Sequence, residues 1–312
     1  ALRRIRNASA EDLARYPELY ADSLRAAVAE RFGVDPEAVT TGAGSDDVLD
    51  STYRAVWGPG TGVSYAAPTF SMVETFATMN GLEARPVPWA EALDDPARLL
   101  RNDPALVYVC RPNNPTGSQA PRPWVEALLD AAGKDGPVVI VDEAYADFGG
   151  DSLIDIASTQ PRLVVARTLS KAYGLAGLRC GFAVARPDVV LEIDKSRGPY
   201  KVSRLAIEAA AAAVRDEEGW MADTIAEAVA ARRRLTSELG LRGLPPLESH
   251  ANFVLMPAPS GDAQADARAL RAAGVGVRPF HDVPEVGDAL RVTVGPLGMT
   301  ARFLSALDDL LR

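Results

Sequence analysis

This chain has few of the residues that build disulfide frameworks or metal centres. It contains two cysteines, Cys110 and Cys180, and two histidines, His250 and His281. Both cysteines border apolar, strand-like runs, so we expect reduced core residues rather than a disulfide or a metal pair. Two histidines alone make no cluster of metal ligands, and we expect no bound metal.

Long apolar stretches and an excess of positive charge are also missing. No run of about 18 or more apolar residues occurs, so the sequence predicts no membrane-spanning helix. The start, Ala1-Leu-Arg-Arg-Ile-Arg6, lacks the apolar core of a signal peptide. The net charge of -9 argues against nucleic acid or an anionic membrane as the main partner, because both require a basic surface. We therefore expect a cytoplasmic enzyme or binding protein.

The composition that remains is that of a soluble globular protein, with 47% hydrophobic and 24% charged residues. Short apolar runs alternate with helical stretches, which predicts an α/β fold. The carboxyl ends of the strands in such a sheet are where ligands bind. Helices are expected at 22–32 and 45–57, and buried strands at 62–65, 105–110, 138–141, 163–166 and 181–185.

The second part of the chain has a different character. A long alanine-rich helix is expected over 207–239, with Gly219 as a weak point. A smaller unit follows it. We predict an N-terminal segment (1–22) that packs with the small domain, a large domain (23–215) and a small C-terminal domain (216–312). Within the last, strands are expected at 252–256, 275–278 and 290–294, and helices at 262–273 and 299–311.

The most informative stretch is Arg167-Thr-Leu-Ser-Lys171-Ala-Tyr-Gly-Leu-Ala-Gly-Leu-Arg179. A lysine just past a buried strand can lose its proton more easily and act as a nucleophilic amine. Ser170 and Arg179 offer a hydroxyl and a fixed cation, which are groups that hold a phosphate. An amine beside a phosphate clamp suggests pyridoxal 5'-phosphate (PLP). For Lys171 taken alone, a surface lysine in a loop is an equal alternative.

Two further motifs follow other strands. In Arg111-Pro-Asn-Asn114-Pro-Thr-Gly117, either Asn114 offers an amide N–H to a cofactor oxygen or the segment is a plain turn. Asp142 ends a buried strand, where a carboxylate is costly unless a cation or donor compensates it. A protonated pyridine nitrogen would do so, and a helix cap is the alternative. Tyr145 could donate a hydrogen bond to the ring hydroxyl.

Two more groups of residues could bind anions. Gly44-Ser45-Asp46 opens a helix after a glycine turn, where free N–H groups and the helix dipole favour an anion. An ordinary capped helix start is the alternative interpretation of this motif. Arg278 and Arg291 each lie in a predicted strand of the small unit. Such arginines usually face solvent, but they could also clamp a carboxylate or phosphate. Arg278 has the weaker case.

In this order, the motifs resemble those of the fold-type I PLP-dependent aminotransferases of class I and II. The resemblance rests on Asn114-Pro-Thr-Gly, Asp142-x-Ala-Tyr145, Ser170-Lys171 and Leu290-Arg-Val-Thr-Val-Gly295, and it covers nearly the whole chain. With Arg15-Tyr16-Pro17 and Pro68-Thr-Phe70 added, the chain is most similar to the histidinol-phosphate aminotransferases. The resemblance implies a mostly parallel central sheet in a large domain, with a smaller α+β C-terminal domain.

The resemblance also implies roles for individual residues. Lys171 is the Schiff-base lysine and catalytic acid/base, and Asp142 pairs with the pyridine nitrogen. Tyr145 and Asn114 hydrogen-bond the ring hydroxyl. Phe70 stacks on the ring, since its flat face suits that role. The remaining implied positions are Gly44, Ser45, Asp46, Thr168, Ser170 and Arg179 around the cofactor phosphate, Tyr16 reaching the phosphate of the partner subunit in a homodimer, and Arg291 with Arg278 at the anionic end of the substrate.

The implied reaction is a ping-pong amino transfer between L-histidinol phosphate and 2-oxoglutarate. Two alternatives share these motifs: an aromatic amino acid aminotransferase, and a lyase like threonine-phosphate decarboxylase. A non-catalytic PLP-binding regulator is a third reading. It is disfavoured because no basic helix-turn-helix precedes the PLP unit and the net charge is acidic.

Overall fold

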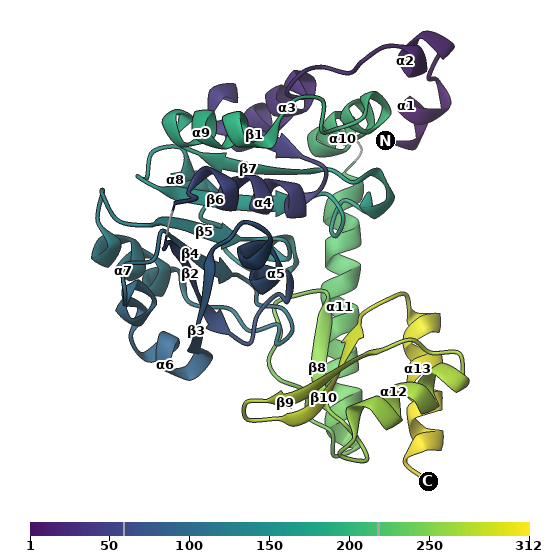
Figure 1. Ribbon diagram of the computed structural model, residues 1–312. Coiled ribbons are helices and arrows are strands. Elements are labelled where there is room, and N and C mark those ends of the chain that lie inside the picture. Colours follow the sequence, from purple (N-terminus) through teal and green to yellow (C-terminus); the bar gives the residue numbers. More distant parts are fainter. Residues whose placement is uncertain (59, 217–218) are drawn as a thin grey trace. The chain divides into compact units, whose positions relative to one another are not determined.

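The computed structural model describes residues 1–58, 60–216 and 219–312, which form two compact units (Figure 1). The first unit comprises residues 1–111, 120–144 and 151–221. The second comprises residues 112–119, 145–150 and 222–312. Across these described ranges, no helix is both long and apolar enough to cross a membrane.

A seven-stranded sheet forms the centre of the first unit, with the order β1-β7-β6-β5-β4-β2-β3. Every neighbouring pair is parallel except the two that β7 makes with β1 and β6. The predicted α/β class and mostly parallel sheet are thus confirmed. The strands are β1 (Val39–Gly42), β2 (Gly62–Ala67), β3 (Glu83–Pro88), β4 (Leu106–Cys110), β5 (Val138–Asp142), β6 (Leu163–Thr168) and β7 (Gly181–Ala185).

The five strands expected in this unit are all present, but β1 and β3 were not predicted. β3 lies at the sheet edge and is partly exposed, so it needs no continuous apolar run. It also contains Pro86 and Pro88. Proline has no backbone N–H to donate, and an edge strand tolerates this because one side of it has no neighbouring strand. β1 is short and carries two threonines, Thr40 and Thr41, which are buried.

Helices cover both faces of this sheet. On one face, Tyr53 of α4, Phe76 of α5 and Ile193 of α9 pack in one core cluster with strand residues that include Tyr108 and Ile140. The other face carries residues such as Phe182, whose ring contacts Phe32 of α3. The helices are α1 (Leu2–Arg6), α2 (Ala10–Ala14), α3 (Asp22–Phe32), α4 (Ser45–Ala55), α5 (Met72–Met79), α6 (Trp89–Asp94), α7 (Arg122–Ala132), α8 (Ile154–Ala157), α9 (Pro187–Arg197) and α10 (Arg204–Arg215).

The N-terminal helices α1 and α2 contact α10, and the whole segment belongs to the first unit. Arg204 of α10 forms an ion pair with Asp12 of α2 at 3.2 Å. This placement differs from our expectation that residues 1–22 pack with the small C-terminal domain. The contact with α10 joins segments far apart in the chain, which a local sequence pattern does not encode.

The second unit is built on a three-stranded antiparallel sheet with the order β8-β10-β9. Leu239, Val254, Leu290 and Phe303 belong to the core cluster that joins the helices to one face of this sheet. The elements are α11 (Trp220–Leu241), β8 (Phe253–Pro257), α12 (Ala263–Ala272), β9 (Arg278–Val283), β10 (Gly287–Thr293) and α13 (Leu297–Leu310).

Two expectations about the second half of the chain are wrong. The single helix over 207–239 is instead two helices, because α10 ends at Arg215 and α11 begins at Trp220. Residues 217–218 of that expected helix lie outside the described residues. The strand expected at 275–278 is also absent from the described structure, since β9 begins at Arg278. Val275 instead donates its N–H to Leu270 O at 2.9 Å at the end of α12, and its side chain packs against the core.

Candidate active site

Three predicted site residues lie at or just beyond the ends of neighbouring strands of the large sheet. β5 and β6 are adjacent and parallel, so their carboxyl ends meet at one edge. Asp142 is the last residue of β5 and lies opposite Ala166 of β6. Thr168 ends β6, and Lys171 follows three residues later on the exposed surface. This edge is where an α/β sheet offers its ligand site.

Asp142 is a buried carboxylate with two protein donors. Its Oδ2 accepts a hydrogen bond from Tyr108 Oη at 2.7 Å, and its Oδ1 accepts one from Ala144 N at 3.0 Å. Burial raises the pKa of Asp142 to about 6, although the hydrogen bond from Tyr108 acts to lower it. A carboxylate held in this way is suited to pair with a cation at the strand edge.

The reversed direction of β7 brings a glycine turn to the same edge. Gly181 begins β7 and lies opposite both Gly42 of β1 and Thr168 of β6. A Cβ on Gly181 would sit 2.2 Å from Ser45 N, at the start of α4. Only a glycine permits this approach, so the close packing of β7 fixes the position of the α4 N-terminus. Gly44 precedes that helix and provides no side-chain cap.

Ser170, Arg179 and Asp46 form the wall of this corner. Arg179 Nη1 donates to Ser170 Oγ at 3.3 Å, and Arg179 Nη2 lies 3.3 Å from Asp46 Oδ2. A Cβ on Gly44 would be 2.7 Å from Arg179 Nη2, so the guanidinium passes directly over the glycine. Helix N–H groups, a hydroxyl and a guanidinium around a small space can hold a phosphate ester.

Two residues that sequence reasoning missed support the glycine turn. Asp47 Oδ2 accepts a hydrogen bond from Ala43 N at 3.0 Å, and Asp47 Oδ1 pairs with Lys201 Nζ at 2.9 Å. Asp47 therefore ties the turn to a segment more than 150 residues later in the chain. Asp47 directly follows the predicted Gly44-Ser45-Asp46 motif in the sequence. No local sequence pattern indicates that Lys201 is its partner.

Two other predicted residues of the first unit have contrasting surroundings. Phe70 is half-buried and packs against the core cluster that contains α4 and α5. Tyr16 is 80% exposed, and its ring lies 5.0 Å from that of Tyr200. An exposed aromatic pair of this kind is available for contact with another molecule.

The second unit brings Asn114 together with Arg291. Arg291 Nη1 donates a hydrogen bond to Asn114 Oδ1. The guanidinium carbon of Arg291 lies 4.8 Å from the centroid of the Phe253 ring, and Tyr145 meets the same ring edge-on at 5.1 Å between centroids. Burial lowers the pKa of Arg291 below its ordinary value, while the nearby Tyr145 acts in the opposite direction. The contacts with Asn114 and Phe253 fix the orientation of the guanidinium, as a clamp for an anion requires.

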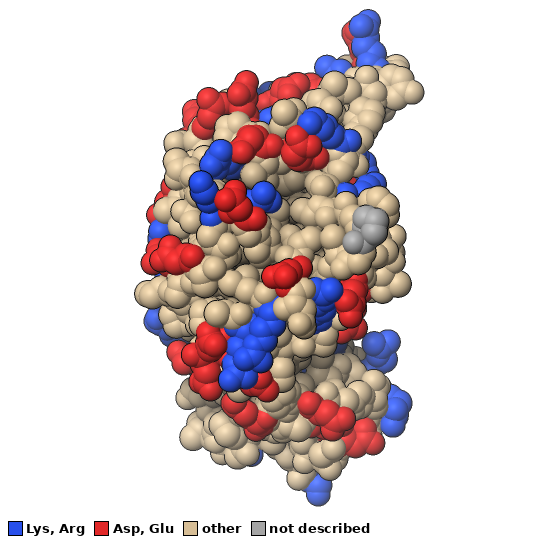
Figure 2. All heavy atoms as spheres, turned by 60° about the vertical axis from the view of Figure 1, so that its left-hand side comes forward, with Lys and Arg blue, Asp and Glu red and all other residues tan. Residues whose placement is uncertain are grey.

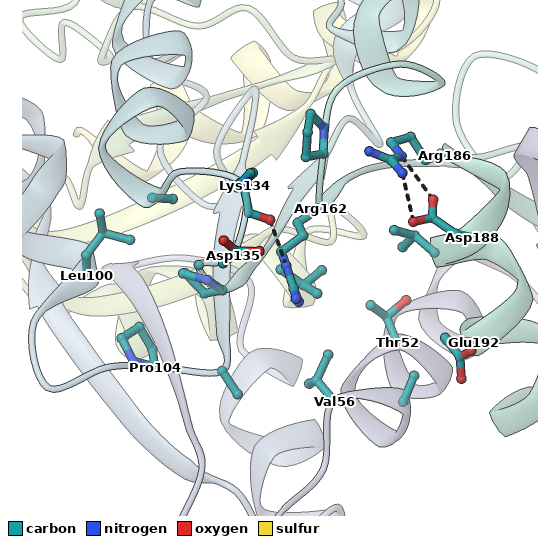
Figure 3. Close-up of a pocket in the computed structure, with 18 of the residues that line it drawn as sticks. Thr52, Val56, Leu100, Pro104, Lys134, Asp135, Arg162, Arg186, Asp188 and Glu192 are labelled. Atoms are coloured by element: carbon teal, nitrogen blue, oxygen red, sulfur yellow. Dashed lines mark hydrogen bonds and ion pairs between the residues drawn. The ribbon is translucent and has the colours of Figure 1, made fainter.

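A cavity of about 950 Å³ lies at the opposite ends of the strands (Figure 3). Pro104, Pro137 and Arg162 precede β4, β5 and β6 and line it together with residues of α4 and α9. Arg162 Nε donates to Lys134 O at 3.2 Å there. Asp142 and Lys171 follow the other ends of these strands, so this cavity is separate from the predicted catalytic residues.

Comparisons with known proteins find matches that cover most or all of this chain. The family model described as aminotransferase class I and II matches residues 1–307. A histidinol-phosphate aminotransferase of Aromatoleum aromaticum is 37% identical, and the match covers 100% of this chain and 88% of that protein. One of Roseiflexus castenholzii is 40% identical, with 90% of this chain and 76% of that protein covered.

A solved structure gives the same result for the fold. The histidinol-phosphate aminotransferase of Sinorhizobium meliloti, in complex with pyridoxal-5'-phosphate, superposes with a TM-score of 0.90 and 28% sequence identity. The match covers 100% of this chain and 86% of that one. The similarity thus extends over both units rather than over an isolated motif.

Proposed function

Because the chain belongs to the family of class I and II aminotransferases, we propose that it moves an amino group between L-histidinol phosphate and 2-oxoglutarate, with PLP as its cofactor. The observation that carries this proposal is a placement: buried Asp142 ends β5, and Lys171 lies three residues beyond the end of the adjacent strand β6. A carboxylate for a ring nitrogen and an amine for a carbonyl carbon are the two groups that this cofactor requires.

The residues at the sheet edge fit PLP. The corner of Gly44, Ser170 and Arg179 has the donors that a phosphate needs, and a side chain at Gly44 would fill part of it. Buried Asp142 suits the protonated ring nitrogen. When bound, the cofactor withdraws electrons from the substrate carbon that carries the amino group. The further proposed contacts of the phosphate are Ser45, Asp46 and Thr168.

The chain's own residues have distinct tasks in this mechanism. The amine of Lys171 holds the cofactor and afterwards moves a proton from the substrate's α-carbon. Asp142 keeps a proton on the ring nitrogen. Asn114 and Tyr145 donate hydrogen bonds to the ring hydroxyl, and Phe70 covers the ring face. Tyr145 is only three residues beyond Asp142, so one short segment carries two of these contacts.

Arg291, with Arg278 beside it, binds the anionic end of the substrate. The guanidinium of Arg291 is supported by Phe253 and Asn114, which leaves its orientation fixed before substrate arrives. A planar guanidinium binds phosphate and carboxylate alike. The same residues can therefore act on the phosphate of histidinol phosphate and on a carboxylate of 2-oxoglutarate.

The active unit in this proposal is a homodimer in which Tyr16 reaches the partner's cofactor phosphate. The high exposure of the Tyr16 ring supports it. Mixing inactive Tyr16→Ala and Lys171→Ala proteins tests the arrangement. Because a mixed dimer would carry both lesions in one site and none in the other, about a quarter of the wild-type activity should return. No recovery in proteins shown to exchange subunits would contradict the shared site.

Steady-state transamination by the PLP-loaded protein tests the substrate. Histidinol phosphate and phenylalanine are compared as amino donors to 2-oxoglutarate, and we expect a large preference in kcat/KM for histidinol phosphate. A preference for phenylalanine would make the chain an aromatic amino acid aminotransferase. Release of carbon dioxide from threonine phosphate without a keto acid would make it a decarboxylase.

Small molecules are the proposed partners, and the cytoplasm is the proposed location. The face drawn in Figure 2 has basic and acidic side chains close together, in line with the net charge of -9. Such a mixed surface does not supply the concentrated positive charge with which nucleic-acid-binding proteins neutralise phosphates.

A further inference from the structure

Tyr108 is a buried residue beside the predicted cofactor site that the mechanism above does not use. It lies in β4 opposite Ile140 of β5, while Cys110 lies opposite Asp142. Alternate residues of a strand share a face, so Tyr108 and Asp142 are diagonal neighbours on the same side of the sheet. The Tyr108 Oη–Asp142 Oδ2 distance of 2.7 Å is that of a strong hydrogen bond to a charged acceptor.

The surroundings make this bond important for the charge of Asp142. Tyr108 is 1% exposed and Asp142 is 3% exposed, so bulk water does not replace either partner. Burial by itself favours the neutral carboxylic acid. The two donors from Tyr108 and Ala144 are therefore what favour the carboxylate before any cofactor is present.

We propose that Tyr108 is a positioning residue of the reaction, whose hydroxyl keeps Asp142 ionised and oriented toward the cofactor's ring nitrogen. This inference rests on the proposed function, because it assigns Asp142 to that nitrogen. Tyr108 does not touch the reacting atoms. It acts through Asp142: the Tyr108 hydroxyl donates a hydrogen bond to Oδ2 of that carboxylate, while Ala144 N donates one to Oδ1.

Tyr53 provides a matched control in the same core. It belongs to the cluster that contains Tyr108, and its side chain is fully buried. Its hydroxyl finds no hydrogen-bond partner among the described residues. Tyr53→Phe and Tyr108→Phe therefore remove the same atom at the same depth, but only the second removes a donor to Asp142.

The experiment measures PLP binding by the cofactor-free proteins, from the absorbance of the bound cofactor, over a range of pH. We expect Tyr108→Phe to raise the dissociation constant roughly 10- to 100-fold, the range expected for a lost hydrogen bond to an ionised group. The pH midpoint of binding should move upward, because Asp142 retains its proton longer. Tyr53→Phe should bind PLP within about twofold of wild type, and thermal unfolding checks that both variants fold.

A double-mutant cycle completes the test. In an Asp142→Asn background, Tyr108→Phe should have little further effect on PLP binding, since the charge it supports is gone. An unchanged dissociation constant and pH midpoint in Tyr108→Phe would overturn the inference, as would an equal effect of Tyr53→Phe. Wild-type protein that binds no PLP would instead contradict the proposed function itself, so the two failures are distinguishable.

Discussion

Arg278 and Arg291 lie directly opposite each other in the antiparallel ladder of β9 and β10. Both guanidinium groups lie over the ring of Phe280, with carbon-to-centroid distances of 5.6 Å for Arg278 and 5.9 Å for Arg291. Arg291 also contacts Phe253 and Asn114, whereas Arg278 is exposed. Like charges placed opposite each other repel, so this pair is favoured when an anion lies between them.

The unequal support of the two arginines predicts unequal effects of substitution. Arg291→Lys keeps the charge but loses the planar fork and its stacking, and we expect KM for histidinol phosphate to rise roughly 10- to 100-fold with a smaller change in kcat. Arg278→Lys should raise KM only a few-fold. Steady-state kinetics of both variants checks this, and a larger effect at Arg278 would reverse the proposed ranking.

Lys171 should be the one lysine to which the cofactor attaches. The chain has four lysines, so peptide mapping after borohydride reduction of the PLP-loaded protein gives a clear assignment. We expect the cofactor's mass on the Lys171 peptide alone, and no turnover in Lys171→Ala. Lys195→Ala is the control, because that exposed side chain pairs only with Glu192 on α9 at 2.6 Å in the described interactions. Wild-type-like transamination by purified Lys171→Ala protein would end the assignment.

Gly181 should be required for cofactor binding. An alanine there would place Cβ 2.2 Å from Ser45 N, so the start of α4 must move and the phosphate corner with it. We expect Gly181→Ala to weaken PLP binding roughly 10-fold or more, by analogy with the loss of a charged hydrogen bond. Gly177→Ala is the matched control in the short 3-10 helix Ala176–Leu178 just before β7, since its Cβ would meet nothing within 4 Å. Equal PLP binding by both variants would show that the corner tolerates the change.

The stability of the cofactor-free protein should depend on pH through Asp142. Its pKa of about 6 in the folded protein lies above the ordinary 3.8, because the carboxylate is buried. The folded state therefore holds the proton more tightly than the unfolded chain, and the destabilising effect develops as pH rises from about 4 to above about 6. Over that range, unfolding experiments should show wild type losing about 2–3 kcal/mol relative to Asp142→Asn. A constant difference between the two proteins would contradict this.

Much of the site could be predicted from the sequence because its residues follow strands. Asp142 comes directly after an apolar run and Lys171 follows another by a few residues, and the carboxyl ends of neighbouring parallel strands meet at one edge. The α/β class and five strands of the large sheet follow from the same runs. Edge strand β3 was missed because an exposed, proline-containing strand has no such run.

The sequence by itself determined the chemical groups of the candidate site: a lysine beyond a strand, an aspartate that ends a buried strand, a glycine turn and two arginines, each recognisable from its neighbours in the chain. Only the tertiary structure decided which groups support them. Tyr108 meets Asp142, Lys201 meets Asp47, and β7 runs in reverse to bring Gly181 against Ser45. These contacts depend on strand order and register, which are set by packing between segments distant in the chain, and no local pattern encodes them.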